Sequence, residues 1–97
     1  MPTYLTLFRY TPEGIAHIKD SPARVAAAKH TFHTLGAEVR AFYLVMGQYD
    51  TIFISEAPDD ETMAQVTLAV AAQGNVTTET LRAFTEEEFR TIVAAVP

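Results

Sequence analysis

The sequence predicts an α+β fold: a ferredoxin-like βαββαβ unit with a C-terminal helix and a four-stranded antiparallel sheet. Four segments carry the alternating, aromatic or Thr-rich pattern that is typical of strands. Two segments with apolar residues at spacings of three and four separate the first strand from the second and the third from the fourth. A short Gly-containing turn joins the second and third strands, which completes the split βαβ order.

Composition favours a single domain over residues 1–97 with one core. The 97 residues are 48% hydrophobic, and a single core usually serves about 50 to 200 residues. The absence of Cys excludes disulfides, thiolate metal sites and thiol nucleophiles. The net charge is −5 and the Lys and Arg residues are scattered, which argues against nucleic acid or an anionic membrane as a partner.

The first strand and the first helix are predicted on either side of an irregular connection. Thr3–Thr11 alternates Leu with aromatic residues and is typical of a strand, which a proline then ends. Ile15–Lys19 is too short to form more than a helical turn. Ser21 stands where an N-cap is expected, with Pro22 at the first helical position, so we expect a helix over Pro22–Leu35.

The middle of the chain predicts a β-hairpin followed by the second helix. Ala37–Met46 is apolar on both faces after its first residues, and Thr51–Ala57 resumes the alternation. Residues 47–50 hold a glycine that can adopt a positive φ, as a hairpin turn requires. Asp59 is the expected N-cap of a helix that runs to about Gln73.

The last part of the chain predicts a strand and a tail helix. Asn75–Phe84 is rich in Thr and is typical of a strand. Thr85 and Glu88 have the spacing of a capping box, which marks a helix start. We expect a buried stripe on this helix, formed by Phe89, Ile92, Val93 and Val96.

The apolar pattern of the strands predicts self-association. Right-handed crossovers place both main helices on one face of the sheet, while the strands carry apolar residues on both faces. A second sheet is the simplest cover, so we expect a homodimer or a larger assembly of the dimeric α/β-barrel type. The N-terminal residues lack signal-peptide features, which predicts a cytoplasmic protein.

Three segments of the chain resemble one known family. They are the hairpin Gly47-Gln48-Tyr49-Asp50, the segment Lys19–Pro22 before the first helix, and Thr78–Phe84 in the last strand. Together and in this order they resemble the GYD-domain family over nearly the whole chain. The resemblance implies a ferredoxin-like unit related to dimeric α/β barrels, and it leaves the activity open.

Three candidate ligand-binding residues lie in connections between elements. His17 follows the first strand, at the end where related folds place ligand sites, although an exposed or structural histidine is the simpler interpretation. Tyr49 and Asp50 lie at the hairpin end. They form either a hydrogen-bonding pair for a ligand or ordinary turn chemistry, in which Asp bonds its own backbone.

Two further candidates lie on strands. Arg82 shares a strand face with Thr78 and Thr80, so it serves either as an anchor for an anionic ligand or as one half of a cross-strand ion pair. Tyr43 has a hydroxyl that needs a partner wherever it is buried.

The histidines of the first main helix do not predict a metal site. On a helical wheel His30 and His33 lie away from the stripe of Val25 and Phe32, so both are expected in solvent. A third ligand would have to come from another segment. The sequence therefore predicts no metal and no cofactor.

Three functions remain open from the sequence. We expect a small-molecule binding or sensing module that works as a homo-oligomer, with a pocket between sheet and helices. One alternative is a cofactor-independent oxygenase or isomerase, by analogy of fold alone, with no catalytic residue assigned. The other is an assembly protein without a ligand.

Overall fold

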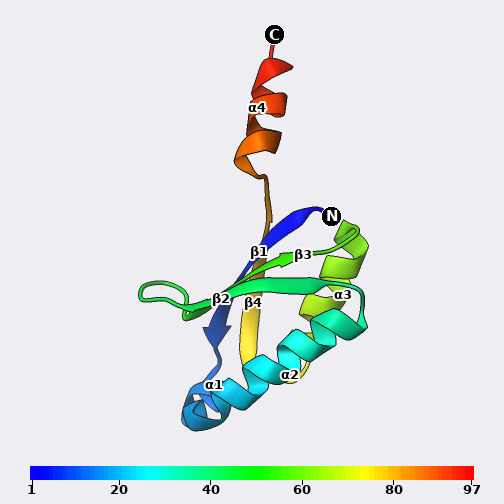
Figure 1. Cartoon of the computed structure of the whole chain (residues 1–97). Coiled ribbons are helices and arrows are strands. Elements are labelled where there is room, and N and C mark those ends of the chain that lie inside the picture. The colour runs from blue at the N-terminus through cyan, green and yellow to red at the C-terminus, as the bar shows by residue number, and fades with distance from the viewer.

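The computed structural model describes all 97 residues as one antiparallel sheet with two main helices (Figure 1). The strand order is β2-β3-β1-β4, and every neighbouring pair is antiparallel. This topology confirms the predicted ferredoxin-like α+β fold. None of the helices is long and apolar enough to cross a membrane. The elements are β1 (Thr3–Tyr10), α1 (Pro12–Ala16), the 3₁₀ helix η1 (Ile18–Asp20), α2 (Ser21–Thr34), β2 (Glu38–Leu44), β3 (Thr51–Glu56), α3 (Asp60–Ala71), β4 (Val76–Ala83) and α4 (Glu86–Ala94).

The connection after β1 is more ordered than the sequence predicted. A five-residue helix, α1, begins at Pro12, and η1 follows it. The side chain of Thr11 accepts a hydrogen bond from the Gly14 N–H at 3.1 Å, so a capping residue and a proline together start this helix. The single turn expected within Ile15–Lys19 was therefore wrong in both start and length.

Ser21 does not cap α2, contrary to the prediction. The N-cap position belongs to Asp20, whose backbone is already helical and whose side chain makes no capping bond. Because η1 leads directly into α2, the residue before the helix never leaves the helical region. The hydroxyl of Ser21 instead lies 2.7 Å from that of Tyr10 on β1, within hydrogen-bonding distance.

The core lies between the sheet and the two helices α2 and α3. Phe53 of β3 is at its centre, with ring centroids 5.1 Å from Phe8, 5.3 Å from Phe32 and 5.8 Å from Phe42. All three pairs are edge-to-face, an arrangement worth about 0.5 to 1.5 kcal/mol each beyond burial. Met63 and Val66 bring α3 onto the same cluster.

The other face of the sheet has no cover from this chain. Residues that pair across strands lie on one face, and Leu5 pairs with Ile54 on one side and Leu81 on the other. Leu7 and Ile52 continue the same apolar band one step along. We call this surface, formed by Leu5, Leu7, Ile52, Ile54 and Leu81, the open face. The prediction that the strands are apolar on both faces is confirmed.

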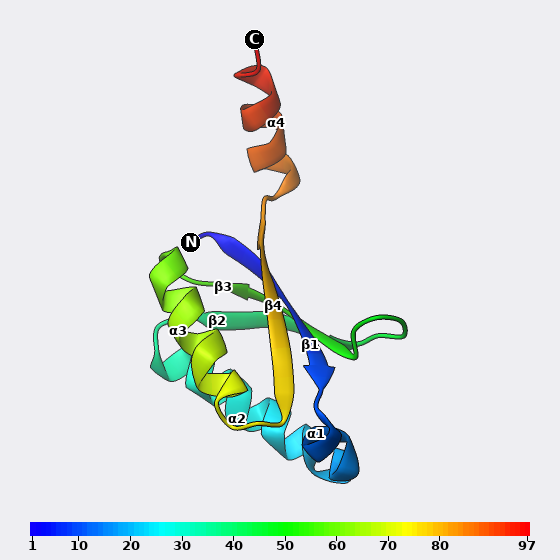
Figure 2. The same ribbon diagram turned by 180° about the vertical axis from the view of Figure 1, so that it is seen from behind.

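Helix α4 stands apart from the rest of the molecule (Figures 1 and 2). The predicted capping box is present, because the Thr85 N–H donates to Glu88 Oε1 at 2.9 Å and the Glu88 N–H donates to Thr85 Oγ1 at 3.1 Å. The predicted burial of its stripe is wrong, since no element of this chain lies against it. The exposed fractions are 59% for Phe89, 47% for Ile92, 50% for Val93 and 64% for Val96.

Candidate functional site

The hairpin and β2 carry three of the residues that the sequence singled out. Tyr43 pairs with Ile52, so it lies on the side of the open face, and 54% of it is exposed. Tyr49 donates its hydroxyl to the Glu79 carboxylate, and this hydrogen bond raises the pKa of Tyr49. Asp50 accepts a hydrogen bond from the Tyr10 N–H at 2.9 Å.

His17 lies in the short link between α1 and η1, and it is exposed. Its Nδ1 is 3.2 Å from the Glu13 carbonyl oxygen, so the ring contacts its own helix. Its backbone carbonyl accepts a hydrogen bond at 3.0 Å from the guanidinium of Arg24 on α2. The part of His17 that faces the domain is therefore its backbone.

Arg82 lies at an open groove of about 340 Å³ between β4, β1 and α3. On the β1 side of this groove, Tyr4 donates its hydroxyl to Asp60 Oδ1 at 2.5 Å. Burial of the phenol, together with this hydrogen bond, raises the pKa of Tyr4 to about 12, so Tyr4 stays neutral at physiological pH. Thr80 of β4 also lines the groove.

The guanidinium of Arg82 is itself held by the chain. It donates to the Thr3 carbonyl at 3.2 Å and lies 3.8 Å from the Glu88 carboxylate. Its central carbon is 4.3 Å from the centroid of the Phe84 ring, a cation–π distance. These contacts tie the end of β4 to the start of α4.

The structure does not bring the five predicted residues together. Strand alternation places Tyr43 on the open side of the sheet and Arg82 on the helix side, because Arg82 pairs with the buried Tyr4. Tyr49 contacts Glu79 and Arg9, which also lie on the open side. The expected pocket between sheet and helices therefore has other lining residues.

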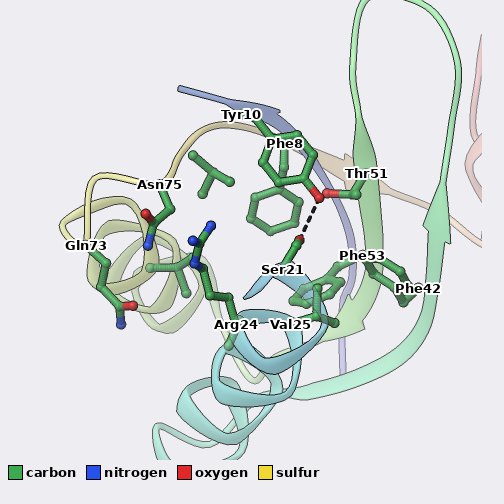
Figure 3. A pocket seen from close by; sticks show the side chains of 13 residues that line it. Phe8, Tyr10, Ser21, Arg24, Val25, Phe42, Thr51, Phe53, Gln73 and Asn75 are labelled. Carbon is green, nitrogen blue, oxygen red and sulfur yellow. Dashed lines mark hydrogen bonds between the residues drawn. The ribbon is translucent and has the colours of Figure 1, made fainter. Parts of the chain in front are cut away.

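That pocket is a cavity of about 50 Å³ between the sheet, α2 and the end of α3 (Figure 3). The rings of Phe8, Phe42 and Phe53 form its apolar wall. Since one water-sized group needs about 10 to 15 Å³, this volume has room for about four non-hydrogen atoms. Its polar lining consists of Tyr10, Ser21, Arg24, Thr51, Gln73 and Asn75.

Arg24 supplies the only charged group of this lining. Its guanidinium donates to the His17 carbonyl at 3.0 Å and makes a long contact of 3.4 Å with the Gly14 carbonyl. Asp20 is 3.9 Å away, and a quarter of the Arg24 side chain is exposed. The arginine therefore lies at the edge of the cavity with part of its donor capacity weakly used.

The hydroxyls of Tyr10 and Ser21, which a dashed line joins in Figure 3, also line the cavity. Ser21 and Arg24 belong to the first turn of α2, where the helix macrodipole favours a negative charge. A guanidinium, hydroxyls and side-chain amides around an apolar floor are suited to binding a carboxylate group.

The wall of the cavity depends on a close approach of two backbone segments. A Cβ on Gly14 would lie 2.0 Å from the Asn75 carbonyl oxygen, so only glycine fits there. The same oxygen accepts a hydrogen bond from the Thr11 N–H at 3.1 Å. Thr11 also donates its hydroxyl to the Gly74 carbonyl at 2.7 Å, which fixes the start of β4 against α1.

Sequence reasoning missed Arg24 and the Tyr10–Ser21 pair. One signal was available for Arg24, because a cation in the first turn of a helix is unfavourable to the macrodipole and so suggests a tertiary role. No comparable signal exists for Tyr10 and Ser21, whose contact depends on how β1 meets α2.

Comparison with known proteins gives one family and one curated relative. The sequence model of the GYD domain family matches residues 4–93 of this chain. A protein of Thermus thermophilus is 34% identical over 84 residues, which cover 86% of this chain and 88% of the relative. That relative bears the name glutamine synthetase and cystathionine beta-lyase binding protein.

The fold is shared by solved structures of other proteins. TTHA0845 from Thermus thermophilus is 28% identical with a TM-score of 0.58, and the match covers 88% of this chain and 95% of that one. A Mycobacterium tuberculosis feast or famine regulatory protein complexed with L-methionine has 14% identity and a TM-score of 0.67. The leucine response regulatory protein of M. tuberculosis has 15% identity and a TM-score of 0.65. The two matches include 88% and 87% of this chain, respectively, and about half of each regulator. At these identities the likeness shows the fold alone.

Proposed function

Since this chain belongs to the GYD-domain family, we propose that it is a small-molecule binding or sensing module that works as a homo-oligomer. The observation that carries the proposal is the cavity between sheet and helices. It combines an aromatic floor with one guanidinium and several neutral hydrogen-bonding groups, the usual composition of a small-ligand site.

The ligand of this module carries a carboxylate. The cavity is about 50 Å³, which suits the head group of a ligand whose remainder extends toward solvent. Arg24 supplies the charge, and Ser21 and Tyr10 supply hydroxyls. Amino acids are a first class to test, because one structural neighbour was solved in complex with L-methionine.

A thermal-shift panel tests the ligand class. The panel pairs each small carboxylate or free amino acid with its uncharged carboxamide. We expect the carboxylates to raise the Tm, by mass action on the folded state, and the carboxamides to leave it unchanged. A panel in which no carboxylate shifts the Tm at millimolar concentration would contradict the proposal.

The open face supports the proposed homo-oligomer. Leu81 is 45% exposed at the β4 edge of an apolar band that no helix of this chain covers. We expect light scattering at micromolar concentration to give at least the mass of a dimer. Leu81→Asp should give a monomer, because the charge would be buried unpaired in the interface. Leu68→Asp on α3, also on an exposed leucine, serves as the matched control. A monomeric wild-type protein would refute the oligomer.

Binding to another protein is the second candidate, and the hairpin favours it. The tip between β2 and β3 projects from the sheet, with Met46 99% and Leu44 74% exposed. The curated relative is named as a binding protein of two enzymes, so glutamine synthetase and cystathionine beta-lyase are the partners to test. We expect co-migration with one of them in size-exclusion chromatography, and its loss in Met46→Asp. If Met46→Asp bound the enzyme as well as the wild-type protein does, the hairpin would be excluded as the binding surface.

A further inference from the structure

Helix α4 exposes apolar residues that its own chain does not cover. Its residues Phe89, Ile92 and Val93, and Val96 just after its end, are each about half exposed or more. A helix of nine residues is only marginally stable in water by itself, because nucleation is unfavourable and so short a helix forms few hydrogen bonds to offset it. The capping box nevertheless fixes its start at Thr85. The sequence thus specifies a helix at a place where the single chain gives it no packing.

The molecule as a whole has more surface than a compact monomer. Its accessible surface is 6348 Å², whereas a compact protein of 10.7 kDa exposes about 5500 Å². The radius of gyration is 14.5 Å, against about 12.5 Å for a compact chain of this length. The excess area, roughly 800 Å², is about what one partner contributes to a stable protein–protein interface.

The junction between β4 and α4 holds the helix away from its own sheet. Arg82 contacts the Thr3 carbonyl, the Phe84 ring and the Glu88 carboxylate, and these three partners span the junction. The reciprocal bonds of Thr85 and Glu88 stiffen the same turn. Folding α4 back onto its own core would break these contacts, so its cover comes from another molecule.

We infer that α4 packs against a second copy of this chain. The inference rests on the proposed homo-oligomer and adds the element that crosses between subunits. Leu81 of the open face is only five residues before Glu86, where α4 begins, so at most about 17 Å of chain separates the sheet interface from the helix. A copy that covers Leu81 therefore comes within reach of α4.

Symmetry favours a second copy over an unrelated protein. In a two-fold dimer each subunit offers the same two surfaces, so the open face and α4 of one chain are covered together with those of the other. The excess surface of each chain matches one side of such an interface. Association then closes at two subunits and leaves neither apolar surface exposed.

The double variant Phe89→Ser/Ile92→Ser tests this contact in the full-length protein. It removes two apolar side chains per helix, and each dimer has two such helices. We expect the Kd of the dimer, measured by sedimentation over a dilution series, to rise by about 100-fold or more. Leu68→Ser, which removes an exposed leucine from α3, should leave the Kd unchanged. The far-UV spectrum reports whether the domain stays folded.

Hydrogen exchange gives a second readout that a folding defect does not produce. In the wild-type protein, the α4 amides should exchange slowly above the Kd and fast below it, because the isolated helix frays. A wild-type dimer with an unchanged Kd in the double variant and unprotected α4 amides would overturn the inference and leave the homo-oligomer intact. A monomeric wild type would overturn both. Protection of α4 only after an added enzyme binds would assign the helix to that partner.

Discussion

Replacing Gly14 by Ala is expected to destabilise the domain by about 2 to 4 kcal/mol. A Cβ at this position would lie 2.0 Å from the Asn75 carbonyl oxygen, far inside van der Waals contact. The obstacle is backbone, so α1 and the start of β4 must move apart, and the Thr11–Asn75 hydrogen bond is lost with them. For a domain of this size the change corresponds to a fall in Tm of about 10 °C or more.

Gly36→Ala is the matched control for this prediction. Gly36 has a φ of 96°, and nothing lies within 4 Å of a Cβ built on it. Its substitution should therefore cost only the strain of a left-handed residue, about 1 to 2 kcal/mol. Urea denaturation compares the two variants. A Gly14→Ala midpoint no lower than that of Gly36→Ala would contradict the close approach of α1 and β4.

Arg24→Gln is expected to weaken carboxylate binding by about 30-fold, which corresponds to about 2 kcal/mol. Glutamine keeps some hydrogen bonding and removes the positive charge, so the loss measures the charge–charge contact. The side chain is one-quarter exposed, which places the expected effect at the low end for a buried pair. Titration calorimetry with the best carboxylate of the thermal-shift panel gives both Kd values.

Arg82→Gln is the matched control for Arg24 and also tests the other proposed anchor. Arg82 contacts the Thr3 carbonyl and Glu88, so its loss should lower the Tm and leave the carboxylate Kd unchanged. The reverse pattern, with affinity lost in Arg82→Gln and kept in Arg24→Gln, would move the ligand to the groove beside Tyr4 and Asp60.

The local sequence determined the order and type of the main elements. Apolar periodicity and turn residues depend on neighbours within a few positions, and they predicted the strands, the two main helices and the hairpin. Two helix starts also depend only on neighbouring residues and were predicted from them. Asp59 caps α3 by accepting from the Thr62 N–H at 2.8 Å, and Thr85 with Glu88 caps α4. Hydrogen bonding from the Thr62 side chain, and then from its backbone, lowers the pKa of Asp59.

The tertiary structure alone decided which side chains meet. Tyr43 and Arg82 lie on opposite faces because the strand register, set by pairing between distant segments, fixes the face of every residue. The candidate site depends on the Tyr10–Ser21 pair and on the approach of Gly14 to Asn75, which are 61 positions apart in the chain. Helix α4 has the periodicity of a buried helix, but periodicity specifies only that a face is apolar and not which surface covers it.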